Sequence, residues 1–127
     1  MKEGMKILVA YDGSDHARKA LSESIVLAEK FQGSLTLLHC CWDESNEASM
    51  NLLKKTEEQL KSTKLKYEYK SERTGNPPER ILRDAREGGF DLIVMGSRGI
   101  GGARAWLMGS VSSKVVAEST IPVLVVK

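Results

Sequence analysis

The sequence predicts an α/β fold, in which an open parallel sheet carries helices on both faces. Apolar runs of strand length alternate with longer segments whose apolar residues recur at helical spacing. Most of the apolar runs lack in–out alternation, which indicates strands covered on both sides. Alternating strands and helices are typical of parallel sheets with right-handed crossovers. The chain has 127 residues, a length typical of one domain, so residues 1–127 are expected to form a single domain.

The first strand–helix–strand unit is predicted from residues 7–11, a short apolar run, and from residues 35–40, a second strand. Between them, Ser14 is a good helix N-cap and Gly33 suits the helix C-terminus. One face of this helix is apolar or small, and it holds Ala17, Ala20, Leu21, Ser24, Ala28 and Phe31.

The middle of the chain is more polar. Residues 43–49 predict a loop, and a helix over about 49–61 follows, with Leu52, Leu53, Thr56 and Leu60 on one face. Residues 64–70 alternate charged side chains with Leu65, Tyr67 and Tyr69. This pattern predicts a half-exposed strand at a sheet edge.

The last part of the chain repeats the strand–helix alternation. Asn76 is a cap, prolines follow it in the first turn, and Glu79 lies three residues after the cap, so a helix begins here and stops at Gly88-Gly89. Residues 91–95 and 122–126 predict strands, and a helix over about 110–119 separates them.

A spaced glycine set follows the strand at 91–95 and consists of Gly96, Gly99 and Gly109, the last followed by Ser110. A glycine at a strand end lets a ligand approach the backbone. A Gly-Ser step that opens a helix presents unpaired N–H groups and the positive end of the helix dipole. The set therefore predicts a phosphate cradle, and a tight turn with close helix–strand packing is the alternative.

Asp12 follows the first strand, in the turn before the first helix. Ligands of open parallel sheets bind outside the carboxyl ends of strands, where the strand order reverses. If the strands at 7–11 and 91–95 are neighbours, Asp12 faces the glycine set and suits a ribose diol. An Asx-turn or helix cap is the alternative role for this carboxylate.

Two common phosphate-binding motifs do not fit. A P-loop needs a Gly-Lys step, and the sequence contains none. In the dinucleotide motif G-x-G-x-x-G, Gly99 and Gly101 would take the first two places, but the third falls on Arg104. The glycine set also follows the fourth strand, whereas that motif follows the first strand of its unit.

The glycine set resembles the G-x2-G-x9-G-[ST] motif of nucleotide-binding universal stress proteins. The resemblance extends to residues 7–14, to Gly75-Asn76-Pro77 and to residues 122–126, so it covers nearly the whole chain. It implies the ATP-binding subclass and a five-stranded parallel sheet of order 3-2-1-4-5. This fold is Rossmann-like, of the adenine nucleotide alpha-hydrolase-like class.

The resemblance also implies a role for individual residues. Asp12 would hold the ribose, the backbone around Ala10 and Cys40 would contact the adenine, and Met95 would line its pocket. The phosphates would be surrounded by Gly96, Arg98, Gly99, Gly109, Ser110, Val111 and Ser112. The ligand would be ATP, AMP or ADP, with Mg²⁺ held by the phosphates and a serine. For Arg98, a solvated loop charge is the alternative.

Composition excludes several other functions. The net charge is +2 with interspersed charges, so no nucleic-acid partner is expected. His16 and His39 are isolated, and no metal site is expected. Adjacent Cys40 and Cys41, together with the absence of an apolar signal core or membrane span, predict a reduced, cytoplasmic protein.

Residues 122–126 form an apolar strand that only Lys127 protects with charge, so we expect a two-fold dimer through this strand, as in relatives. Arg104 and Lys114 are expected at the surface. Trp106, Leu107 and Met108 are expected to pack in the interior, and an exposed patch for a protein partner is the alternative.

The sequence thus predicts an ATP-binding stress-response protein that acts as a nucleotide-dependent switch or interaction module. No catalytic residue is assigned, because the glycine set has no P-loop lysine and no second acid at metal spacing. One alternative is a very slow ATPase or phosphotransferase. A second is a nucleotide-free dimeric interaction module of the same fold, and a third, an electron-transfer or adenylating relative, rests on architecture alone.

Overall fold

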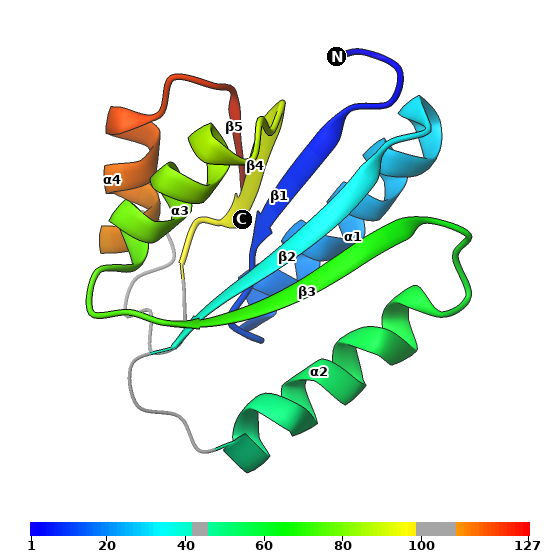
Figure 1. The fold of residues 1–127 in the computed structure, drawn as a ribbon, viewed down its shortest axis with the longest axis horizontal. Coiled ribbons are helices and arrows are strands. Elements are labelled where there is room, and N and C mark those ends of the chain that lie inside the picture. Colours follow the sequence, from blue (N-terminus) through cyan, green and yellow to red (C-terminus); the bar gives the residue numbers. More distant parts are fainter. Residues whose placement is uncertain (42–45, 99–108) are drawn as a thin grey trace.

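In the computed structural model, which describes residues 1–41, 46–98 and 109–127, five parallel strands form one sheet (Figure 1). The strands are β1 (Lys6–Ala10), β2 (Ser34–Cys41), β3 (Lys66–Arg73), β4 (Leu92–Gly96) and β5 (Val123–Val126). The helices are α1 (Asp15–Phe31), α2 (Asn46–Leu60), α3 (Pro77–Glu87) and α4 (Ser110–Glu118). The strand order is β3-β2-β1-β4-β5, so the expected fold class is confirmed.

The two faces of the sheet are covered by different helices (Figure 1). Ile7 and Val9 of β1 pack in one core cluster with residues of α1 and α2. Leu8 packs in a second cluster, on the opposite face, with residues of α3 and α4. Because both faces of the central strands are buried, these strands read as continuous apolar runs in the sequence.

The position of the candidate site follows from the pairing of β1 with β4. The register places Ala10 opposite Met95, the residue before Gly96. From β1 the chain crosses to β2 on one side, while β4 lies on the other side, so the strand order reverses between β1 and β4. The turn that carries Asp12 and the turn after β4 therefore leave the sheet side by side, as expected for a ligand crevice.

The two predicted helix caps are confirmed. The Ser14 hydroxyl accepts a hydrogen bond from the Ala17 amide at the start of α1 (3.2 Å). The Asn76 side-chain oxygen accepts a hydrogen bond from the Glu79 backbone amide (3.3 Å). The side-chain nitrogen of Asn76 in turn donates to the Glu79 carboxylate (3.2 Å). These bonds satisfy amides that have no partner inside the helix and fix where α1 and α3 begin.

The predicted C-terminal glycine of α1 has a different role. Gln32, not Gly33, takes the left-handed conformation that ends the helix, with φ of 51°. A Cβ on Gly33 would lie 2.5 Å from the Met5 carbonyl oxygen. The glycine is therefore required by close approach of the chain to the residue that precedes β1.

Two predicted boundaries are wrong. Helix α2 begins at Asn46, within the expected loop over 43–49; the acidic Glu47 in its first turn is favourable at the positive end of the helix dipole. Strand β3 covers Lys66–Arg73 and not 64–70. It pairs with β2 up to Cys41 opposite Arg73, so the ladder holds the polar residues after Lys70 in the strand.

Candidate functional site

A cavity of about 420 Å³ opens at the carboxyl ends of β1 and β4. Every predicted site residue that the structure describes lines it: Ala10, Asp12, Cys40, Met95, Gly96, Arg98, Gly109, Ser110, Val111 and Ser112. Gly99 lies outside the described residues, as do Arg104 and residues 106–108. The fold thus brings together residues from the first strand, the fourth strand and the start of α4.

Five further residues line the cavity that sequence reasoning did not assign to the site: Tyr11, Ala17, Leu38, Pro77 and Ile81. Leu38 lies two positions before Cys40 in β2, so strand alternation could have placed it on the same face. Pro77 and Ile81 are one helical turn apart in α3, but the sequence gives no sign that α3 reaches the crevice. Their contribution depends on how α3 packs on the sheet.

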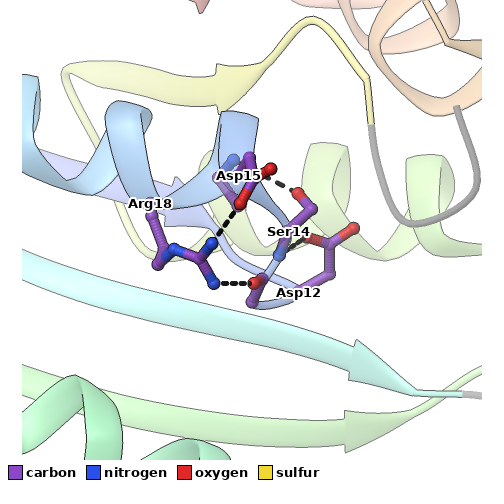
Figure 2. A network of polar contacts seen from close by, with 6 residues as sticks. Asp12, Ser14, Asp15 and Arg18 are labelled. Atoms are coloured by element: carbon purple, nitrogen blue, oxygen red, sulfur yellow. Dashed lines mark hydrogen bonds and ion pairs between the residues drawn. The ribbon is translucent and has the colours of Figure 1, made fainter.

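The turn that carries Asp12 is held in shape by local polar contacts (Figure 2). One carboxylate oxygen of Asp12 accepts a hydrogen bond from the Ser14 amide (2.9 Å), which forms the Asx-turn that was the alternative role for Asp12. The Arg18 guanidinium donates to the Gly13 carbonyl (2.9 Å) and pairs with Asp15. The carboxylate therefore lines the cavity from a turn whose backbone is already fixed.

The start of α4 presents backbone amides to the cavity. Gly109 is the N-cap, with extended φ and ψ of −69° and 165°, and no side chain caps the helix. The Gly109 amide donates to the Ser97 carbonyl (2.6 Å), which ties the helix start to the end of β4. The first amides of α4 have no partner inside the helix, and together with the helix dipole they can bind an anion.

Ser97 joins the segments around this end of the cavity. Its carbonyl also accepts from the Ser112 hydroxyl (2.8 Å), and its amide donates to the Val126 carbonyl (2.8 Å). Its hydroxyl lies 2.9 Å from Nδ1 of His16 in the first turn of α1. The ends of β4 and β5 and the starts of α1 and α4 are thus linked through one buried serine.

The surrounding structure restricts the two described glycines of the motif to different degrees. A Cβ on Gly96 would lie 2.6 Å from the His16 Cβ and 2.8 Å from its carbonyl carbon, so α1 packs directly on this glycine. A Cβ on Gly109 would meet nothing closer than the Ser97 carbonyl oxygen at 3.4 Å, an ordinary contact. Packing within the described protein therefore requires glycine at position 96 but not at position 109.

The other end of the cavity is apolar and lies between the sheet and α3. Leu38, Cys40 and Met95 come from the strands, and Pro77 and Ile81 come from α3. Leu38, Met95 and Ile81 belong to the core cluster on this face, and Cys40 packs against it. Such a slot between apolar surfaces suits a flat, weakly polar group such as a nucleobase.

Arg80 of α3 forms ion pairs beside this apolar end. Its guanidinium contacts Glu72 of β3 and Asp84 of α3, each at 3.1 Å. Partial burial lowers the pKa of Arg80, but the hydrogen bond and charge of Asp84, with the charge of Glu72, raise it above its ordinary value. The guanidinium is thus a permanent cation near Cys40.

The charges around the cavity fit an anion and a diol at separate places. Among the described lining residues, Arg98 is the cation and Asp12 the carboxylate. The described part of the chain holds no group of three or more His, Cys, Asp or Glu side chains that could bind a metal. No helix in that part is long and apolar enough to cross a membrane.

Comparison with known proteins identifies the family. The model of the universal stress protein family (Usp) matches residues 5–127. Universal stress protein YxiE of Bacillus subtilis is 34% identical over 96% of this chain and 98% of its own length. A universal stress protein of Thermus aquaticus is 35% identical over 95% of this chain and 97% of its own.

Solved structures agree with this match. The protein MJ0577 of Methanocaldococcus jannaschii superposes with a TM-score of 0.78 at 30% identity, over 97% of this chain and 95% of that one. A universal stress protein solved in complex with cAMP superposes with a TM-score of 0.80 at 22% identity, over 99% and 98% of the two chains. The chain therefore belongs to the universal stress protein family.

Proposed function

We propose that this stress protein binds an adenine nucleotide, with ATP as the principal ligand, and that the bound nucleotide acts as a switch for a conformation or a partner. The observation that carries the proposal is that Asp12 of the β1–α1 turn and the start of α4 line the same cavity. An acceptor for a ribose diol and donors for phosphate are the two polar features that a nucleotide requires.

Gly109 supports the phosphate end of this proposal. Its conformation and its contacts accept a Cβ, so the fold of the described residues does not explain why the position is glycine. A ligand that lies against the backbone at the start of α4 would explain it, because a phosphate approaches helix amides closely. Arg98 and the amides of Ser110, Val111 and Ser112 would share its charge.

The apolar end of the cavity supports the proposal that the ligand carries a nucleobase. Adenine would lie between Met95 and Cys40 on the sheet side and Ile81 on the α3 side, with Ala10 nearby. Proteins of the same fold have been solved in complex with cAMP and with dAMP, adenine nucleotides that differ from ATP in their phosphate and, for dAMP, also in the sugar. The proposed ligands therefore include AMP and ADP, with Mg²⁺ held by phosphate oxygens and a serine hydroxyl.

Binding without fast turnover fits the site better than catalysis. Asp12 is the carboxylate among the described lining residues, and one of its oxygens is already bonded to the Ser14 amide. Hydrolysis needs a group that orients the attacking water and cations that stabilise the developing charge. We expect at most very slow ATP hydrolysis, so occupancy of the site, not product formation, would carry the signal.

The first experiment is to purify the protein without added nucleotide, denature it with heat and identify the released small molecules by mass spectrometry. Near-stoichiometric adenine nucleotide is the expected result, and its mass gives the phosphate number. Protein that releases nothing is then titrated with Mg-ATP in a calorimeter. No released nucleotide and no heat of binding would contradict the proposal and favour a nucleotide-free interaction module.

We further propose that two copies pair through β5. This strand lies at one edge of the sheet and its residues are half-buried, without a charged side chain between Val123 and Val126. An unprotected apolar edge favours pairing with a second strand. Sedimentation velocity over a range of concentrations tests this: a dimer is expected, and a monomer at all concentrations would refute it.

A further inference from the structure

The ion-pair cluster of Glu72, Arg80 and Asp84 connects the edge strand β3 to α3. The guanidinium contacts Glu72 through one terminal nitrogen and Asp84 through Nε. The three side chains are partly buried, with exposed fractions of 34% for Glu72, 23% for Arg80 and 13% for Asp84. A planar guanidinium that bonds two carboxylates at once holds them in a defined geometry, which a single surface pair does not.

The cluster lies directly behind the apolar end of the cavity without lining it. Glu72 is the register partner of Cys40, so the two residues are neighbours on adjacent strands. Residues at even positions of β2 and β3 share the face on which α3 packs, and Cys40 contacts the core cluster of that face. Glu72, which Arg80 contacts on β3, is thus the neighbour of Cys40, which lines the cavity.

On α3 the cluster and the cavity lining occupy neighbouring stripes of one helix. Pro77 and Ile81 are four residues apart and line the cavity. Arg80 and Asp84 are also four residues apart and form the next stripe, which turns toward β3. A movement of Arg80 relative to Glu72 would therefore move Pro77 and Ile81 relative to Cys40, because a helix turn behaves as a rigid unit.

We propose that Arg80 is a positioning residue that sets the width of the slot between α3 and the sheet, and thereby the preference of the site for adenine over smaller bases. This inference rests on the proposed nucleotide binding. A flat ring gains contact from both walls only when their separation matches it, and a small displacement of one wall removes much of that contact. The phosphate end is built on α4 and β4 and includes no residue of this ion-pair cluster.

The test compares two nucleotides that share the phosphate and ribose but differ in the base. Affinities for ATP and UTP are measured by calorimetry for the wild type, Arg80→Met, Arg80→Lys, Glu72→Gln and the control Arg83→Met. Arg83 lies on the same helix outside the cluster. Thermal melts of every variant establish that it is folded at the temperature of the titration.

We expect wild-type protein to prefer ATP, and Arg80→Met to lower the ATP affinity about tenfold with UTP affinity changed less than about twofold. Arg80→Lys keeps the positive charge but loses the planar guanidinium that contacts both carboxylates. The ratio of its ATP affinity to its UTP affinity should therefore lie between the ratios of the wild type and Arg80→Met. Glu72→Gln should lower the ratio as well, and it serves as the test if Arg80→Met does not fold. Arg83→Met should leave the ratio unchanged.

An equal loss of ATP and UTP affinity in Arg80→Met, or an unchanged ratio, would overturn the inference and leave nucleotide binding intact. The same holds if the wild type binds ATP and UTP equally well. A wild type that binds neither nucleotide would overturn the proposed function, and this inference with it. The two failures are therefore distinguished by the wild-type titration alone.

Discussion

The end of β4 and the start of α4 each carry a glycine of the same motif, Gly96 and Gly109, but the space around the two glycines differs. At Gly96 the neighbouring helix α1 occupies the space that a side chain would need. At Gly109 a Cβ would make only ordinary contacts with the described protein, the nearest at 3.4 Å, and the residue lines the cavity. Gly96 is thus explained by packing within the chain, whereas the contacts of Gly109 leave room for the proposed ligand.

This comparison separates two meanings that a glycine motif combines. The sequence gives equal weight to both positions, because it shows only that the residue is glycine. Geometry shows which atoms a side chain would meet, and so which substitutions should damage the fold and which should damage binding alone. Three substitutions test this separation, and a fourth, far from both glycines, tests whether binding is insensitive to a remote contact.

The largest effect is expected for Gly96→Ala. The new Cβ would meet the Cβ and carbonyl carbon of His16 and, at 3.0 Å, the Ala17 amide nitrogen, and backbone atoms of a helix cannot move aside without repacking α1. We expect the free energy of unfolding to fall by about 3 kcal/mol, measured by urea denaturation. Gly109→Ala is the matched control, and equal stability of the two variants would contradict the packing argument.

Gly109→Val should give the opposite pattern. Its backbone conformation is extended and allowed for valine, so we expect stability within about 1 kcal/mol of the wild type. The branched side chain would occupy the place of a phosphate, and ATP binding should become undetectable by calorimetry. Retained ATP affinity would show that the start of α4 does not hold the phosphates.

Ser112→Ala tests the link between the two glycines. The buried hydroxyl donates to the Ser97 carbonyl (2.8 Å), and this carbonyl keeps a second bond from the Gly109 amide. Because no acceptor is left unsatisfied, we expect a loss of about 1 kcal/mol in stability. ATP affinity should fall about threefold as the start of α4 loosens. Ser113→Ala, at an exposed position of α4, is the control for both measurements.

The smallest effect is expected at Asp91, before β4, at the end of the strands opposite to the cavity. Its carboxylate accepts a hydrogen bond from the Lys6 amide (2.8 Å) and pairs with Lys2 (3.1 Å). The bond from the Lys6 amide, together with the nearby lysines, holds the pKa of Asp91 below its ordinary value of 3.8 against the opposing effect of burial. The carboxylate therefore stabilises the fold at neutral pH, and this contribution is lost as the pH falls below 3.8.

Asp91→Asn should consequently lower stability by less than about 1 kcal/mol at pH 7, since most of the amide bond is retained by the new side-chain oxygen. The difference from the wild type should shrink as the pH approaches about 3. Denaturation curves at several pH values measure it. ATP affinity should not change, and a change would show that the two ends of the central strands are coupled.

Much of the fold follows from the sequence because its signals are local. The Ser14 and Asn76 caps and the apolar runs define most element boundaries, since these features act over a few residues. One error reflects a neighbouring strand: β3 extends to Arg73 because β2 pairs with it that far. At the end of α1, contact with Met5 accounts for Gly33, which the helix pattern could not indicate.

The candidate site divides in the same way. The sequence by itself determined the family pattern, the strand-end Asp12 and the Gly-Ser step that opens α4, because backbone donors and turn residues leave a signature at fixed spacing. Only the tertiary structure decided that Pro77 and Ile81 of α3 complete the cavity and that Arg80 ties their helix to β3. Apolar residues at helical spacing look alike wherever a helix packs, so their place in a site depends on contacts between distant segments.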